Sequence, residues 1–104
     1  MDGLNERAVI IGDARAIVAE SAIISRRLRS RVLELRSVLV PEHLRGQGMG
    51  NALLTKICTI ADLDGHALFL MPDDDNLESW YYRHGFERIQ DDPVVVMLRR
   101  PLST

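Results

Sequence analysis

The chain has 104 residues, of which 46% are hydrophobic, so it can form one small domain with a core but not two. Its formal net charge of -2 gives no general attraction to nucleic acid or to an anionic membrane surface, and we expect neither a membrane span nor a signal peptide. The single cysteine, Cys58, excludes an internal disulfide and indicates a reducing compartment. We therefore expect a cytoplasmic protein with a single domain over residues 1–104.

Three strands are predicted in the first part of the chain. Residues 7–11 form the first, and residues 15–25 form the second, with a helix as the alternative because the apolar spacing there is ambiguous. The arginine-rich residues 26–30 are expected to form a charged connection. No aromatic residues interleave with these arginines, so we expect a solvated hairpin tip and not a nucleic-acid site. Residues 31–40 form the third strand.

The alternation of side chains in this third strand predicts which of them share a face of the sheet. Leu33, Leu35 and Leu39 are expected on one face, since successive side chains of a strand point to opposite sides. The other face would carry Val32, Glu34, Arg36, Val38 and Val40.

A helix is predicted from Gly48 to about Asp64, where Asp64-Gly65 ends it. Its buried stripe is expected to consist of Leu53, Leu54, Ile57, Cys58 and Ala61. The continuous apolar run over residues 67–71 predicts a strand that is covered on both faces.

The last part of the chain predicts one more helix and two strands. The helix ends near His84, because Gly85 is a suitable C-terminal stop. Residues 86–89 and 94–99 are expected to form the final strands.

Three glycines at the start of the predicted central helix indicate a phosphate site. Without side chains at Gly46, Gly48 and Gly50, a phosphate can approach the backbone N–H groups of the helix N-terminus, where the helix dipole adds attraction. No lysine follows these glycines, which excludes a P-loop, and the G-x-G-x-x-G dinucleotide pattern fails from Gly46 and from Gly48. The sequence therefore predicts a pyrophosphate site of another kind.

Two motifs together resemble a known family. The pattern Arg45-x-x-Gly48-x-Gly50 resembles the coenzyme A signature of the GNAT superfamily of N-acetyltransferases, and residues 80–86 resemble the family's late aromatic-Tyr-x-x-x-Gly-Phe motif. Both occur in the family's order, and the resemblance covers a core of about residues 32–98. It implies a GNAT-like acyl-CoA N-acyltransferase fold, an α/β (α+β) architecture with a mixed sheet. The usual first two helices would be lacking, as in a minimal version similar to the small GNAT domains of phages and mobile elements.

The resemblance implies that acetyl-CoA is the acyl donor. Its pyrophosphate would bind at the glycine turn, and its pantetheine arm would pair with the end of the preceding strand like an added strand. The coenzyme A-binding residues expected on this basis are Leu39, Val40, Arg45, Gly46, Gln47, Gly48, Met49, Gly50, Asn51 and Tyr81.

Tyr81 is implied by the resemblance as the general acid that protonates the departing thiolate. A helical wheel separately favours it over Tyr82, because Tyr81 shares a face with Leu77, Trp80 and His84. The alternative is a purely structural aromatic residue, with the proton supplied by water.

Glu34 resembles the position of the glutamate base in histone-type members of the family. A base is needed because an amine such as lysine, with a pKa of about 10.4, must lose a proton before it attacks. The alternative, which we favour, is a strand carboxylate paired with Arg31 or Arg36. No metal site is expected, since the acidic run at residues 73–75 lacks the spacing of a calcium loop.

Two functions of different classes are consistent with these features. The first is transfer of acetyl to an amine by direct attack, the acceptor being a protein lysine, a protein N-terminus or a small amine. The second is a non-catalytic module that binds coenzyme A or another protein. Because few residues precede Val32, part of a sheet face would stay uncovered, and we expect a homodimer or a partner protein to cover it.

Overall fold

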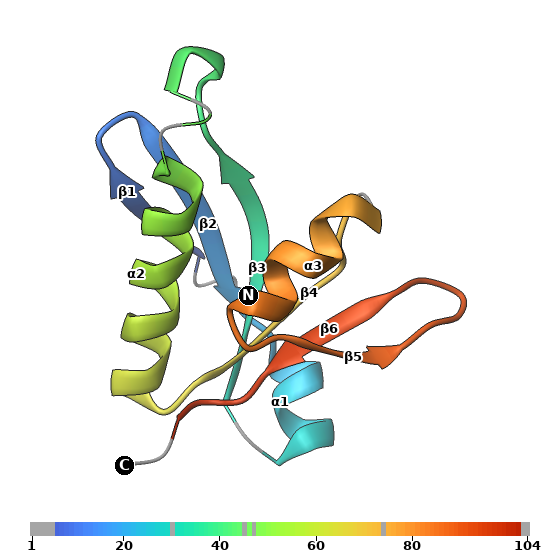
Figure 1. Ribbon diagram of the computed structural model, residues 1–104. Helices are drawn as coiled ribbons and strands as arrows, with labels where there is room; N and C mark the ends of the chain where they lie inside the picture. The colour runs from blue at the N-terminus through green and yellow to red at the C-terminus, as the bar shows by residue number, and fades with distance from the viewer. Residues whose placement is uncertain (1–5, 30, 45, 47, 74, 103–104) are drawn as a thin grey trace.

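The computed structural model describes residues 6–29, 31–44, 46, 48–73 and 75–102. In this part of the chain six strands form one sheet in the order β1-β2-β3-β4-β6-β5, in which β3 and β4 are parallel and all other neighbours are antiparallel. Figure 1 shows α2 packed beside the β1 and β2 end of this sheet. The elements are β1 (Glu6–Ile11), β2 (Ala14–Glu20), α1 (Ala22–Leu28), β3 (Val32–Leu39), η1 (Glu42–Leu44), α2 (Met49–Asp64), β4 (Ala67–Leu70), η2 (Asp75–Leu77), α3 (Glu78–Arg83), β5 (Glu87–Gln90) and β6 (Val96–Arg99).

The second half of the chain confirms the predicted elements closely. α2 ends at a left-handed Gly65 with φ 72°, and α3 ends at the C-cap His84 before Gly85 with φ 94°. All four residues of β4 are buried, as expected for a strand covered on both faces. No helix among the described residues has the length and apolar character to cross a membrane.

The prediction for residues 15–30 is wrong in part, because the second strand ends at Glu20 and a helix follows. Ser21 caps α1, since its side chain accepts a hydrogen bond from the Ile24 backbone N–H at 3.3 Å. Ser25 then ties α1 to β3 by accepting from the Val32 N–H at 2.9 Å. The apolar run over residues 15–25, whose spacing was ambiguous, is therefore a strand up to Glu20 and a helix after the Ser21 cap.

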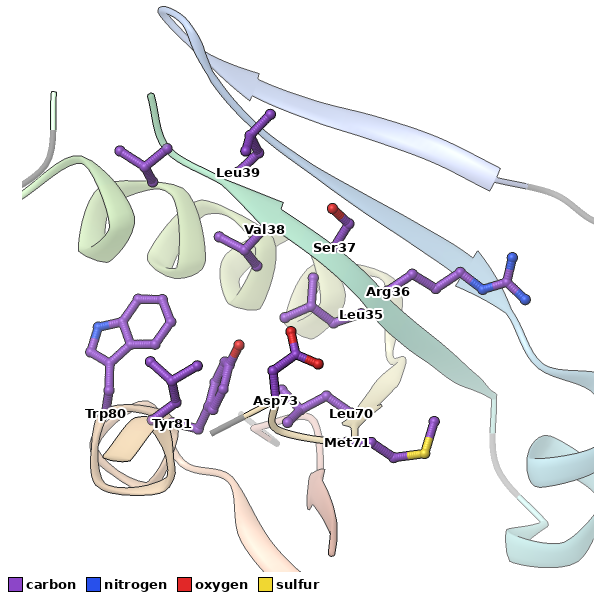
Figure 2. A pocket seen from close by; sticks show the side chains of 12 residues that line it. Leu35, Arg36, Ser37, Val38, Leu39, Leu70, Met71, Asp73, Trp80 and Tyr81 are labelled. Atoms are coloured by element: carbon purple, nitrogen blue, oxygen red, sulfur yellow. The ribbon is translucent and has the colours of Figure 1, made fainter. Parts of the chain in front are cut away.

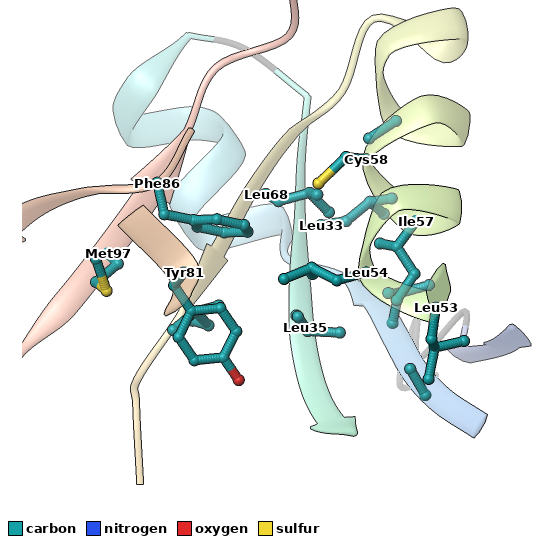
Figure 3. Packing of buried hydrophobic residues seen from close by; sticks show 14 of the residues in the cluster. Leu33, Leu35, Leu53, Leu54, Ile57, Cys58, Leu68, Tyr81, Phe86 and Met97 are labelled. Carbon is teal, nitrogen blue, oxygen red and sulfur yellow. The ribbon is translucent and has the colours of Figure 1, made fainter. Parts of the chain in front are cut away.

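The main core lies between the sheet and α2. Figure 3 shows side chains from α2, α3 and the strands meeting there. All five residues predicted for the buried stripe of α2 are buried. The opposite face of the sheet carries a smaller apolar cluster under α1, which consists of Val32, Ala67, Phe69 and Leu98 with Ile24 packed against them.

A β-bulge interrupts the pairing of β2 with β3. Ile17 pairs with Ser37 and Val18 pairs with Leu35, so Arg36 is an extra residue on β3. A bulge of this kind bends the strand and reverses the alternation of its side chains.

The predicted faces of the third strand are therefore wrong beyond the bulge. Leu33 and Leu35 face the main core as predicted, but Val38 and Val40 also pack against that core. Leu39, which was expected beside Leu33, is 44% exposed instead. A one-residue insertion moves every later side chain to the other face, and the sequence pattern alone carries no sign of it.

Candidate functional site

A cavity of about 300 Å³ opens between the C-terminal half of β3, the end of β4 and α3. Figure 2 shows the side chains of the residues that line it. The cavity is lined by Leu35, Arg36, Ser37, Val38, Leu39, Val40, Leu70, Met71, Asp73, Leu77, Trp80 and Tyr81.

The cavity exists because two parallel strands pair only briefly. The pairs run from Val32 with Ala67 to Glu34 with Phe69, after which β3 continues to Leu39 while β4 ends at Leu70. Among the described residues no strand pairs with this edge of β3 beyond Glu34. An extended ligand can therefore lie along it as an added strand would.

The glycine turn supplies the backbone geometry of an anion site at the start of α2. Gly46 and Gly48 have φ values of 82° and 77°, which side chains of L-residues rarely adopt, and a Cβ atom at either would meet nothing within 4 Å. The α2 ladder begins with the Ala52 N–H bonded to the Gly48 oxygen at 3.0 Å. The preceding N–H groups have no partner within the helix, so they can donate to an anion. Arg45 and Gln47 lie outside the described residues.

Gly50 and Asn51 also join α2 to α3. A Cβ atom on Gly50 would lie 3.4 Å from the Trp80 ring, at the limit of ordinary van der Waals contact, so the start of α2 lies directly against Trp80. The Asn51 side-chain oxygen accepts a hydrogen bond from the Trp80 indole N–H and lies 3.3 Å from the His84 Nε2. These contacts use the side-chain oxygen of Asn51, so its backbone N–H and its side-chain amide nitrogen remain the groups that could donate to a phosphate. Sequence reasoning gave Trp80 no part in the site, although its helical spacing places it beside Tyr81.

Tyr81 lies at the inner wall of the cavity. It is 8% exposed, whereas Tyr82 is 67% exposed, as the helical wheel predicted. Its ring packs against Trp80 and Phe86, with centroids 4.9 and 5.6 Å away. Burial, and to a lesser degree the charge of Asp73, raise the pKa of Tyr81, so its hydroxyl stays protonated at neutral pH.

Glu34 is not among the residues that line the cavity. Its carboxylate accepts a hydrogen bond from the Arg36 Nε at 3.1 Å, and Arg36 also binds Glu6. This is the structural alternative considered from the sequence. Leu39 and Val40 do line the cavity, and Met49 packs half-buried against the main core at the first position of α2. The described residues contain no group of three or more potential ligands that could hold a metal ion.

A comparison with known protein families identifies the family of this chain. A model of the acetyltransferase (GNAT) domain matches residues 5–88. The chain belongs to the GNAT family. The mixed sheet with its diverging parallel pair agrees with this, and no curated protein sequence matches the chain.

Several solved structures share the fold of this chain. The KacTA–DNA complex is similar at 17% identity and a TM-score of 0.73, over 96% of this chain and 69% of that chain. A structure described as histone acetyltransferase HPA2 and related acetyltransferase, from Corynebacterium glutamicum, is similar at 19% identity and a TM-score of 0.69, over 99% of this chain and 67% of that chain. The anti-CRISPR protein AcrVA5 is similar at 19% identity and a TM-score of 0.66, over 89% of this chain and 96% of that chain. At such identities the likeness shows the fold alone.

The residues of this GNAT domain fit an acyl-coenzyme A. The open space around Gly46 and Gly48 and the N–H groups of α2 suit a pyrophosphate. The edge of β3 beyond Glu34 suits an extended pantetheine arm, and the cavity beside it leads to the Tyr81 hydroxyl.

Proposed function

We propose that this GNAT domain is an acyl-CoA-dependent N-acyltransferase that transfers acetyl from acetyl-CoA to an amine. The observation that carries the proposal is a combination of three features: the glycine turn at the start of α2, the edge of β3 with which no described strand pairs beyond Glu34, and the cavity along that edge, which the buried Tyr81 lines. Membership of the GNAT family supports both the donor and the class of reaction. The acceptor is an amine of a protein lysine, a protein N-terminus or a small molecule.

Binding of the donor would use the backbone more than side chains. The pyrophosphate would accept hydrogen bonds from the N–H groups at the start of α2, with Arg45 and Gln47 on the same turn. The pantetheine arm would pair with the backbone at Leu39 and Val40, where a backbone N–H would polarise the thioester carbonyl.

The reaction would proceed by direct attack of the amine nitrogen on the thioester carbon. The C–S bond breaks, and Tyr81 gives its proton to the departing sulfur. A tyrosine is protonated across the neutral range even at its ordinary pKa of about 10, and the raised pKa of Tyr81 keeps it so at higher pH. Glu34 would act as the base only for an acceptor that reaches it from outside the cavity, since Arg36 holds its carboxylate.

A non-catalytic module is the second candidate. The exposed apolar side chains of Ile10 and Leu39 support an interface with a second copy or a partner protein. Both candidates are consistent with a cytoplasmic, single-domain protein.

Native mass spectrometry and a transfer assay separate the two candidates. The enzyme should carry or take up acetyl-CoA and acetylate at least one member of a panel of small amines and lysine-rich proteins. Acetyl-CoA binding without hydrolysis or transfer to any member would favour the module. A folded protein that binds no acetyl-CoA would overturn the proposed function.

A further inference from the structure

Asp73 brings a carboxylate into the cavity beside the Tyr81 hydroxyl. It lies in the loop that follows β4, and Figure 2 shows its carboxylate and the Tyr81 hydroxyl pointing into the same space. Among the described residues that line the cavity, Asp73 is the only acidic one. The sequence indicated no role for it beyond an acidic run that does not form a calcium loop.

No structural role among the described residues accounts for this carboxylate. The N-cap of α3 is Leu77, without a side-chain cap hydrogen bond, so Asp73 does not cap that helix. Arg36, the basic residue in the same cavity wall, is bonded to Glu34 and Glu6. No potential metal-binding group forms among the described residues either.

The sign of this charge constrains what the carboxylate can bind. Coenzyme A is an anion, so a carboxylate in the cavity opposes the donor and the thiolate that leaves. It attracts a cation, and an aliphatic amine with a pKa of about 10.4 is a cation at neutral pH. A carboxylate also accepts the N–H bonds of an ammonium group, and such charge-assisted bonds are stronger than neutral ones.

We propose that Asp73 binds the acceptor as a protonated primary amine and selects cationic amines over neutral nucleophiles. This inference rests on the proposed N-acyltransferase function. It names the substrate class as a primary ammonium group on an aliphatic chain, as in a lysine side chain or a small alkylamine, since Leu35, Val38 and Leu70 line the same cavity and can contact the methylene groups of that chain.

The protons balance over one turnover. The ammonium held by Asp73 loses one proton to solvent and becomes a nucleophile. Its nitrogen then bonds to the thioester carbon, the C–S bond breaks, and the sulfur takes the Tyr81 proton. The nitrogen loses its second proton, which restores Tyr81 through solvent. The net products are an amide, free coenzyme A and one released proton.

Binding of the acceptor can be tested without any transfer. Trp80 is the only tryptophan of the chain and lines the cavity, so its fluorescence reports on an occupant. Titration with butylammonium should change this fluorescence saturably, whereas butanol, the neutral analogue, should not. Asp73→Asn should abolish the response. An equal response to butanol, or in Asp73→Asn, would overturn the inference.

The second test measures KM for the amine. Asp64→Asn is the matched control, because it removes the same charge from an exposed position at the end of α2 far from the glycine turn. For a cationic amine, Asp73→Asn should raise KM about tenfold or more while the protein still binds acetyl-CoA, as expected for a hydrogen bond to a charged group. Asp64→Asn should keep the wild-type KM. An unchanged KM in Asp73→Asn would contradict the inference.

The two proposals fail in different ways. If wild type transfers no acetyl group but still binds butylammonium through Asp73, the proposed function fails and the ammonium site stands. If transfer occurs and Asp73→Asn behaves like wild type in both tests, the function stands and the ammonium site fails.

Discussion

Tyr81 shows how its surroundings could prepare one side chain for catalysis. Its ring is held between Trp80 and Phe86, which fixes the direction of the hydroxyl. Burial and the nearby Asp73 both disfavour the phenolate, so the pKa of Tyr81 rises. The hydroxyl is thus protonated when a substrate arrives, as a general acid must be, but the raised pKa also makes it a weaker acid than an ordinary tyrosine.

Replacing Tyr81 by phenylalanine should separate chemistry from binding. Only the hydroxyl is lost, so the fold and the affinity for acetyl-CoA should persist while transfer slows about 10²-fold or more. Tyr82→Phe is the control, because Tyr82 is 67% exposed. Steady-state rates and calorimetry measure the two quantities. Equal rates in wild type and Tyr81→Phe would remove Tyr81 from the mechanism.

At the scale of elements, α2 and α3 are joined at two points. Asn51 links them near the glycine turn, through Trp80 and His84. At the other end Arg99 of β6 donates to Asp62 at 2.7 and 3.0 Å and to the His84 carbonyl oxygen at 2.8 Å. These contacts hold the tyrosine-bearing helix against the helix that forms the turn.

The Asp62–Arg99 pair should contribute to stability in a pH-dependent way. The hydrogen bonds from Arg99 hold the pKa of Asp62 below its ordinary value, and the Leu102 N–H adds a smaller effect. This stabilisation is present above the unfolded pKa of about 3.9 and is lost as the pH falls through the lower folded value. Asp62→Asn should cost about 2 kcal/mol at pH 7, the value for hydrogen bonds to charged groups.

Urea unfolding at neutral and acidic pH checks this prediction. The difference between wild type and Asp62→Asn should narrow in acid, and the exposed Asp64→Asn should change little at either pH. A constant difference would show that the charge of Asp62 does not carry the effect.

The elements were predictable from sequence to different degrees. The apolar stripe of α2 and the buried run of β4 have strong periodic patterns, and both are confirmed. The helix α1 depends on the Ser21 cap and on the Ser25 bond to Val32, which the apolar pattern does not contain. The bulge at Arg36 depends on pairing with β2, a tertiary contact that local sequence does not specify.

For the molecule as a whole, the sheet is covered unequally. α2 covers one face at β1 and β2, where Val9 and Ile11 pack against the main core. Ile10 points the other way and is 55% exposed, in register with Arg15 and Leu39 across the sheet. α1 covers only the cluster nearer β4 and β6. This exposed strip is where the expected homodimer or partner protein would bind.

Ile10→Asp should weaken self-association if this strip is the interface. Light scattering at micromolar concentration should show wild type larger than a monomer and the variant smaller. Leu63→Asp is the control, since Leu63 is 80% exposed near the C-terminal end of α2. A monomeric wild type that binds no hydrophobic dye would contradict the prediction.

The candidate site was predictable where backbone chemistry defines it. Gly46 and Gly48 have the positive φ values that such a turn requires, and Tyr81 faces inward as its helical spacing predicts. Asp73 was missed because nothing in the local sequence distinguishes it from its neighbours in the acidic run at residues 73–75; only the fold brings it to the cavity that Tyr81 lines.

The central claim is that the turn at the start of α2 binds acetyl-CoA, and calorimetry tests it most directly. Gly48→Glu puts a carboxylate where a phosphate should bind. Gly65→Glu places the same residue at a left-handed glycine at the other end of α2, where a Cβ atom also meets nothing within 4 Å. Both folded variants carry similar backbone strain, so the account predicts binding by wild type and Gly65→Glu and none by Gly48→Glu. Equal affinity of the two variants for acetyl-CoA would contradict it.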